Sequence, residues 1–176
     1  MKKSFIALAL ALLTALSVLP ATAFAAEPAD ENKQACARSK PDLKDHGPEP
    51  FVDKLARLTK KNPNFRTAIW TGKELQLTVM SIPKGGEVGL EMHDDTDQFL
   101  YVVEGTGTAQ MGAASDKLTY NQPVEKGSGI FVPVGTWHNI TNSGDCDLKL
   151  FTVYAPPHHP HGTVHKTKAD ADAAEH

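Results

Sequence analysis

The chain has 176 residues, a formal charge of −3 at pH 7 and 40% hydrophobic residues, a composition that suits a single soluble domain. Its lysines and arginines are scattered and outnumbered by acidic residues, so the sequence lacks the basic stripe that binds nucleic-acid phosphates. We therefore expect no nucleic-acid partner.

Residues 1–25 have the pattern of a secretory signal peptide: two lysines, an apolar run and a small-residue motif that ends at Ala25. A membrane anchor is the alternative, but the apolar run is short for a spanning helix and ends at Pro20. No cysteine stands at the cleavage site, which argues against a lipoprotein anchor. We expect cleavage after Ala25 and a secreted or periplasmic protein with no stable membrane anchor.

The mature chain keeps two cysteines, Cys36 and Cys146. In an oxidising compartment the two could form a disulfide that ties the N-terminal segment to the turn before the last strand. The alternative is a pair of unpaired thiols, because spacing alone does not show that the two approach each other.

Residues 26–64 read as a leader with one short helix. The part up to about Pro50 is polar and rich in proline, which predicts a mobile segment without a core of its own. Residues 51–61 carry Val52, Leu55 and Leu58 at helical spacing, and Pro63 follows them. This pattern predicts a short amphipathic helix that lies on the domain.

Residues 65–155 change to a period of two, which is typical of strands, and Gly, Pro, Asp or Asn separate the runs. The predicted strands are 65–71, 74–82, 88–93, 98–104, 106–111, 117–125, 129–133, 138–142 and 148–154. Short strands at this rhythm predict an all-β sandwich or small barrel. Residues 156–176 have three prolines among their first five residues, which predicts an extended C-terminal tail that lies on the barrel and then frays.

Four polar residues in this β region have the arrangement of a metal site. Glu91 and His93 are two apart, so in a strand their side chains share a face. Residues 94–97 resemble a hairpin loop, which would place His93 opposite Gln98 on a paired strand. His138 would then come from a distant strand, which requires a closed or sandwiched sheet.

Two glycine-framed blocks resemble the paired motifs of the cupin superfamily. Gly85, Glu91, His93, Gln98 and Gly105 hold the positions of the first motif, and Gly127, Pro133, Gly135, His138 and Asn142 hold those of the second. The resemblance implies an antiparallel double-stranded β-helix, or jelly-roll barrel, with one divalent metal inside. The stretch from Phe65 onward is also similar to bacterial cupins loosely described as mannose-6-phosphate isomerase-like, a description that reflects architecture and does not fix a reaction.

The ligand set departs from the usual three His and one Glu of that family. Here Glu91 stands at a His position and Gln98 at the Glu position, beside His93 and His138. Two His and one carboxylate form the facial triad of non-haem iron sites, and mixed nitrogen and oxygen ligands also suit Mn, Ni, Co, Cu or Zn. The alternative is a metal-free polar interior in which hydrogen bonds satisfy the same side chains.

Two further groups of residues could contribute to a site. Leu100 and Val102 share the strand parity of Gln98 and are predicted to form an apolar pocket wall beside the metal. His158, His159, His161 and His165 lie in the tail. They could form a second metal site, but a solvated tail with some His packing is favoured because prolines interrupt the spacing.

The leading function is an exported metal-binding cupin with a small-molecule pocket, acting as a dioxygenase-like oxidoreductase or an isomerase-like enzyme. The motifs contain no second carboxylate or lysine as a general base, so Glu91 is the candidate catalytic residue. Either Glu91 would have to leave the metal, or the substrate would supply the proton transfer. The alternative is a non-catalytic module that binds or senses a small sugar or acid. Exposed edge strands favour a homodimer.

Overall fold

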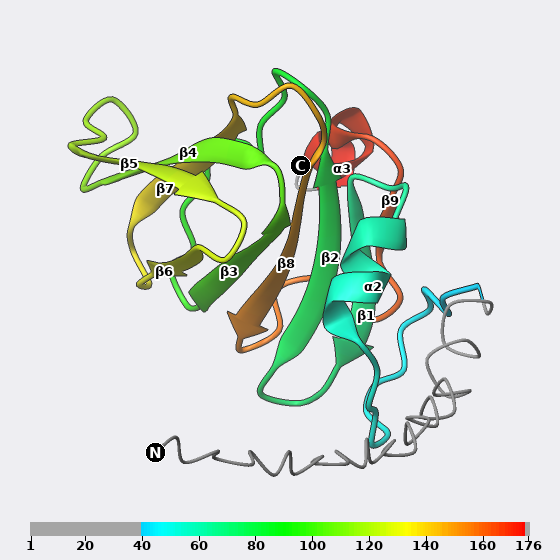
Figure 1. The fold of residues 1–176 in the computed structure, drawn as a ribbon. Helices are drawn as coiled ribbons and strands as arrows, with labels where there is room; N and C mark the ends of the chain where they lie inside the picture. Colours follow the sequence, from blue (N-terminus) through cyan, green and yellow to red (C-terminus); the bar gives the residue numbers. More distant parts are fainter. Residues whose placement is uncertain (1–39, 175–176) are drawn as a thin grey trace, which may run out of the picture. The chain divides into compact units, whose positions relative to one another are not determined.

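The computed structural model describes residues 40–174, and within this range the chain forms strands and two short helices (Figure 1). In chain order they are α2 (Leu55–Lys61), β1 (Arg66–Thr71), β2 (Gln76–Ile82), β3 (Asp97–Glu104), β4 (Thr106–Gly112), β5 (Tyr120–Glu125), β6 (Gly129–Val132), β7 (Trp137–Asn142), β8 (Leu148–Ala155), β9 (Val164–His165) and α3 (Lys168–Ala174). The predicted all-β jelly roll with a short helix ahead of it is confirmed.

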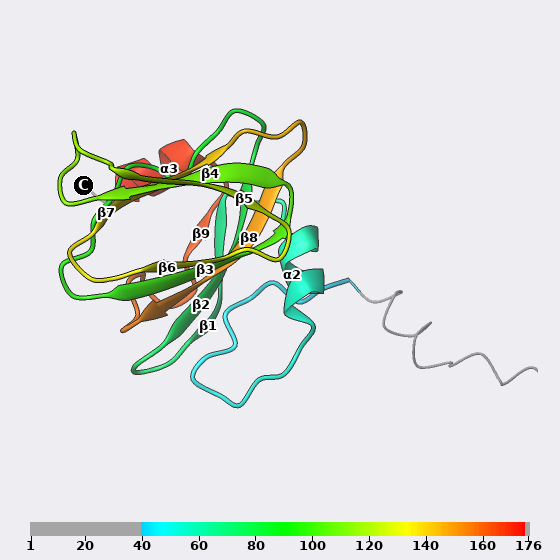
Figure 2. The same cartoon turned by 60° about the vertical axis from the view of Figure 1, so that its left-hand side comes forward.

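The strands form two antiparallel sheets, in the orders β6-β3-β8-β2-β1-β9 and β5-β4-β7. Figure 2 shows the smaller sheet lying over one part of the larger sheet. Two isolated bridges, Glu87 to Thr141 and Glu91 to His138, attach the segment before β3 to the free side of β7. Residues 87–91 thereby extend the smaller sheet beyond β7, although they form isolated bridges and no regular strand.

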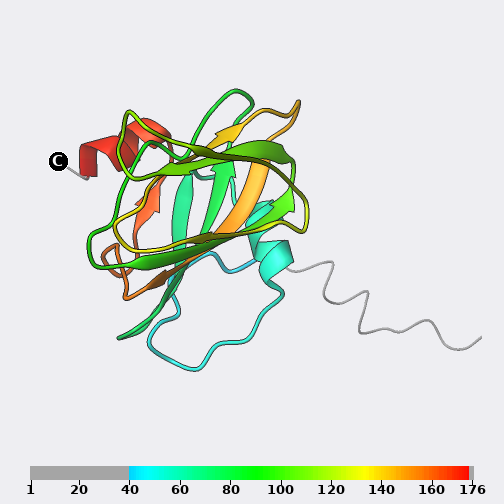
Figure 3. The ribbon, with the colours of Figure 1, turned by 90° about the vertical axis from the view of Figure 1, so that its left-hand side faces the viewer.

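The apolar core lies in two places because β2 is covered on both faces. Met80 and Ile82 belong to the core between the sheets, whereas Leu77 and Val79 lie in a second cluster with Leu58 of α2. All seven residues of β2 are accordingly buried. Figure 3 shows α2 on the outside of the larger sheet. The predicted amphipathic helix therefore covers an apolar face of this sheet that would otherwise be exposed to solvent.

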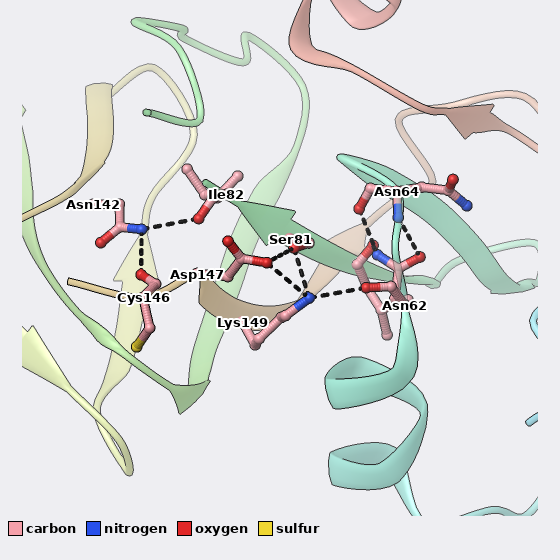
Figure 4. Close-up of polar contacts among 9 residues, drawn as sticks. Asn62, Asn64, Ser81, Ile82, Asn142, Cys146, Asp147 and Lys149 are labelled. Carbon is pink, nitrogen blue, oxygen red and sulfur yellow. Dashed lines mark hydrogen bonds and ion pairs between the residues drawn. The ribbon is translucent and has the colours of Figure 1, made fainter. Parts of the chain in front are cut away.

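Polar side chains close the end of the barrel near Lys149, where α2, β2 and β8 meet (Figure 4). The Lys149 ammonium donates to the carbonyl oxygen of Asn62 at 3.0 Å and to Ser81 Oγ at 2.7 Å, and it lies 3.3 Å from a carboxylate oxygen of Asp147. Asn142 Nδ2 donates to the carbonyl oxygens of Ile82 and Cys146, each at 2.9 Å. These bonds fix the turn between β7 and β8 against the end of β2.

Replacing Asn142 with Ala should lower the free energy of unfolding by about 1 to 3 kcal/mol, because the buried carbonyl oxygen of Ile82 and the partly buried one of Cys146 lose their donor. The amide N–H of Gly144, which donates to Asn142 Oδ1 at 3.0 Å, loses its acceptor as well. Urea unfolding of Asn142→Ala beside Asn121→Ala measures this effect, since Asn121 is exposed on β5. Equal losses in the two variants would contradict the anchoring role of Asn142.

The predicted hairpin between residues 88–93 and β3 is wrong. Residues 88–93 form no strand, and β3 pairs with β6 and β8 instead. Gly89 has φ of 119°, a conformation that interrupts a regular strand, and its N–H donates to the Asn139 side chain at 3.1 Å. His93 and Gln98 are therefore not cross-strand partners.

The leader is more ordered than its composition predicted, within the part that the structure describes. The His46 N–H donates to the Ile69 carbonyl at 2.8 Å, and Leu43 and Phe51 pack against the cluster under α2. The predicted signal peptide and Cys36 lie outside the described residues, so the disulfide stays a prediction. Within residues 40–174, no helix is both long and apolar enough to cross a membrane.

The C-terminal tail also differs from the extended, fraying segment that was predicted. β9 pairs with β1, and α3 follows it. Thr167 and Asp170 bond reciprocally at the start of α3, with Thr167 N–H to Asp170 Oδ2 at 2.9 Å and Asp170 N–H to Thr167 Oγ1 at 3.2 Å. This capping box is visible in the sequence and would have predicted the helix. Ala171 of α3 reaches the core between the sheets.

Candidate metal centre

The backbone brings Glu91 and His138 together. The Glu91 N–H donates to the His138 carbonyl at 3.0 Å, and the His138 N–H donates to the Glu91 carbonyl at 2.9 Å. Two residues later, the His93 carbonyl accepts from the Gly135 N–H at 2.7 Å. The chain before β3 is thus held against β7, and both of its candidate ligands lie beside His138.

The three side chains converge on one point inside the barrel. His138 Nε2 lies 3.3 Å and His93 Nε2 lies 3.5 Å from Glu91 Oε1. Their exposed side-chain fractions are 1% for His138, 5% for His93 and 14% for Glu91. None of these three atoms has a hydrogen-bond partner, although all three are buried. Buried polar atoms without partners are costly, and an ion bound to all three would remove that cost.

The hydrogen bond of the His138 ring also fits a role as a metal ligand. Its Nδ1 lies 2.9 Å from the Thr136 carbonyl, which can only accept a hydrogen bond. Nδ1 is therefore the nitrogen that donates this bond, and Nε2 is left facing Glu91, where it could bind an ion. A backbone carbonyl on the far nitrogen is the usual arrangement of a metal-binding His.

The charge state of Glu91 fits an ion as well. Burial by itself would raise the pKa of Glu91, but the His138 and His93 rings and the nearby Arg66 guanidinium favour the carboxylate and hold that pKa well below its ordinary range. Glu91 is therefore an anion at neutral pH. It supplies negative charge next to two imidazole nitrogens.

The distances match those of ligands that share one ion. Two atoms that each lie about 2.1 Å from an ion, at an angle of about 90° to 109°, are about 3.0 to 3.4 Å apart. The distance of 3.3 Å from His138 Nε2 to Glu91 Oε1 lies within this range, and the distance of 3.5 Å from His93 Nε2 lies just above it. Among residues 40–174, the group of His, Cys, Asp and Glu side chains that could hold an ion is Glu91, His93 and His138.

Gln98, the fourth predicted ligand, lies on the facing sheet. It is 3% exposed, and neither polar atom of its amide has a hydrogen-bond partner. In the ladder it pairs with Tyr154, whose ring meets the His93 ring edge-on at 5.9 Å between centroids. Gln98 therefore belongs to the same polar end of the barrel as His93, and its role as a ligand stays a prediction.

The inner face of the larger sheet changes from polar to apolar along the barrel. Successive rows across β2, β8 and β3 are Gln76, Tyr154 and Gln98; Thr78, Thr152 and Leu100; and Met80, Leu150 and Val102. Leu100 and Val102 are fully buried in the core between the sheets. They belong to the apolar rows next to the polar row of Gln76, Tyr154 and Gln98. Their contact with a ligand stays a prediction.

The histidines of the tail are not a simple solvated segment. His158 is exposed, yet its ring centroid lies 4.1 Å from that of His93. His159 is 8% exposed, and burial together with the nearby Arg66 charge lowers its pKa to about 2, so its ring stays neutral. The residue pattern gave no signal for these contacts, and no second metal group involves these histidines within the described range.

Two cavities bear on the candidate site: Glu91 lines the smaller one, whereas none of the three converging side chains lines the larger one. One of about 540 Å³ lies between β4, β5 and β6 and is lined by Met111, the ladder partner of His138, together with Tyr120 and Ile130. The other, of about 190 Å³, lies beside Glu91 and is bounded by Arg66 and by Lys168 of α3. The larger one has the size of a small-molecule pocket.

Comparison with known proteins agrees with this architecture. The cupin domain family model matches residues 78–154. The uncharacterized protein YrkC of Bacillus subtilis is 54% identical over 133 residues, which cover 76% of this chain and 72% of that protein. The uncharacterized protein L612 of Acanthamoeba polyphaga mimivirus is 36% identical over 115 residues, covering 65% and 70% of the two chains.

A solved structure gives the same result at the level of the fold. The crystal structure of BH2720 from Bacillus halodurans superposes with a TM-score of 0.74 at 53% identity, over 74% of this chain and 99% of that one. The relatives' names state no activity for the site. Taken with the barrel and the converging side chains, these similarities show that the chain belongs to the cupin superfamily.

Proposed function

We propose that this protein is an exported cupin that binds one divalent metal ion through Glu91, His93 and His138, with Gln98 as a fourth ligand. The observation that carries the proposal is the convergence of three buried ligand atoms without hydrogen-bond partners, at distances of 3.3 and 3.5 Å about Glu91 Oε1. A shared ion would satisfy all three atoms at once.

The donor set of two imidazoles, one carboxylate and one amide suits Mn, Fe, Ni, Co, Cu or Zn. When bound, such an ion would polarise an oxygen of a small ligand or, if redox-active, activate O₂. The cavity of about 540 Å³ lined by Met111 is the proposed ligand pocket, because Met111 is paired with His138.

Elemental analysis of the purified protein tests the metal site. We expect close to one ion per chain in the wild type and a large loss in Glu91→Ala and in His138→Ala. His161→Ala is the matched control, because it removes a histidine of the tail outside the metal group. Equal substoichiometric metal in all four proteins would overturn the proposed site.

Glu91 is also the proposed catalytic residue, and the metal-loaded protein is proposed to be a dioxygenase-like or isomerase-like enzyme. One observation favours the non-catalytic alternative, a module that binds a small sugar or acid. The pKa of Glu91 is held well below its ordinary range by His138, His93 and Arg66 against the effect of burial, which makes Glu91 a weak base.

Oxygen uptake by Fe-, Mn- and Ni-loaded protein, screened across phenolic and small-acid substrates, separates the oxygenase from the binding module. Consumption that depends on Glu91 supports turnover. Ligand binding by calorimetry without any uptake would support the binding module instead. Export after cleavage at Ala25 and assembly as a homodimer remain part of the proposal; mass spectrometry of exported protein and size-exclusion chromatography test them.

A further inference from the structure

The segment between β8 and β9, residues 156–163, lies beyond the end of the cupin family match at residue 154. We call it the strap. The Gln76 side chain holds its middle, since Gln76 Nε2 donates to the His159 carbonyl at 2.8 Å and the His159 N–H donates to Gln76 Oε1 at 2.9 Å. Near its end, the Thr163 carbonyl accepts from the Ala68 N–H at 2.8 Å. The strap is therefore tied to β1 and β2.

These ties place the ring of His158 over the metal centre. It lies 4.1 Å from the His93 ring at an interplanar angle of 55°, and it stacks on Tyr154 at 5.7 Å and 25°. His158 is exposed, whereas His93 is 6% exposed. An exposed ring in contact with a buried ring shields the buried one from solvent.

His158 does not belong to the group of converging ligand atoms. In the described part of the chain, the atoms that lie within 4.8 Å of one another come from Glu91, His93 and His138. The ring of His158 is thus placed to cover a ligand, and a wall is a better description of it than a fourth ligand.

We propose that His158 is a positioning residue of the metal centre: its ring forms the solvent-side wall over His93 and narrows the approach to the ion. The role of His158 toward an ion rests on the metal site proposed above, and only the second of the two tests below depends on that site. Gln76 and the strap hold the wall in place, so a segment outside the family motifs determines which small ligands reach the metal.

The first test needs no metal. Diethyl pyrocarbonate is added to the metal-free full chain, and peptide mass spectrometry follows modification of His93. We expect modification several-fold faster in His158→Ala than in wild type, and near the wild-type rate in His158→Phe, which keeps a ring. His161, which is exposed, serves as an internal reference. An unchanged His93 rate in His158→Ala would overturn the wall, whatever the fate of the metal site.

The second test uses the Co²⁺-loaded chain and azide, followed by visible absorption. His158→Ala should keep one Co²⁺ per chain and bind azide several-fold more tightly, whereas His158→Phe should match the wild type. Loss of Co²⁺ in both His158 variants would show that His158 is a ligand and overturn the wall. Failure of the wild type to bind Co²⁺ would overturn the metal site alone. The first test would still show whether His158 shields His93.

Discussion

Replacing Glu91 with Gln should weaken divalent-metal binding about 100-fold or more, because the only negative charge of the triad is lost and a neutral amide oxygen is a weaker ligand than a carboxylate. The substitution keeps the shape of the side chain, so the fold should survive. Competition of Zn²⁺ or Co²⁺ against a chromophoric chelator measures the affinity. A metal effect on stability checks it independently, since an ion at 100 times its Kd raises the free energy of unfolding by about 2.7 kcal/mol.

Gln98 supplies the matched comparison for Glu91. A neutral amide oxygen is a weak ligand, so Gln98→Ala should lower the affinity about tenfold or less. The double variant Glu91→Gln with Gln98→Glu moves the carboxylate to the facing sheet and should recover much of the affinity lost in Glu91→Gln. No recovery in the double variant would show that Gln98 does not reach the ion. Equal affinities of wild type and Glu91→Gln would refute the role of Glu91 itself.

The positions of these candidate ligands were predictable because the cupin motifs carry them at fixed spacing. The glycine-framed blocks predicted the barrel, and His138 does lie in a different sheet from Gln98. The wrong step was local: residues 88–93 alternate in polarity as a strand would, yet Gly89 adopts a positive φ and breaks the ladder. Alternation does not report the backbone angle of a glycine, so the pattern could not reveal the break.

The strap could not be predicted for a different reason. Its order comes from distant partners, chiefly Gln76, which is 83 positions away from His159 and bonds its backbone in both directions. Proline and histidine content describes only what the segment can do alone. Contacts of this kind depend on the finished sheet, and so the composition of the tail predicted a solvated segment where the structure has one tied to β1 and β2.

A buried carboxylate helps to join the described part of the leader to the strap. Asp45, whose side chain is 1% exposed, accepts from Thr71 Oγ1 at 2.6 Å and from the N–H groups of Gly47 and Gly162, each at 3.0 Å. His161 Nε2 lies 3.6 Å away. The leader, β1 and the strap therefore meet at a single side chain.

Replacing Asp45 with Ala should lower the free energy of unfolding by about 2 to 4 kcal/mol, because several donors lose a charged acceptor at once. Urea unfolding measures the loss, and Asp116→Ala is the control because Asp116 is exposed. Hydrogen exchange of residues 158–163 should also speed up in Asp45→Ala, since Gly162 is released. Unchanged exchange there, with stability lost elsewhere, would show that Asp45 does not hold the strap.

The contribution of the Asp45 carboxylate to stability should depend on pH. Burial alone would raise the pKa of Asp45, but the hydrogen bonds from Thr71, Gly162 and Gly47 outweigh it, so the folded pKa lies below the ordinary value. The stabilisation is therefore fully present above the unfolded pKa of about 3.9 and is lost as the pH falls through the folded pKa. The gap in unfolding free energy between wild type and Asp45→Asn should be constant near neutrality and shrink on acidification. A gap that does not change between neutral pH and pH values below the folded pKa would show that the charge of Asp45 contributes nothing to the joint.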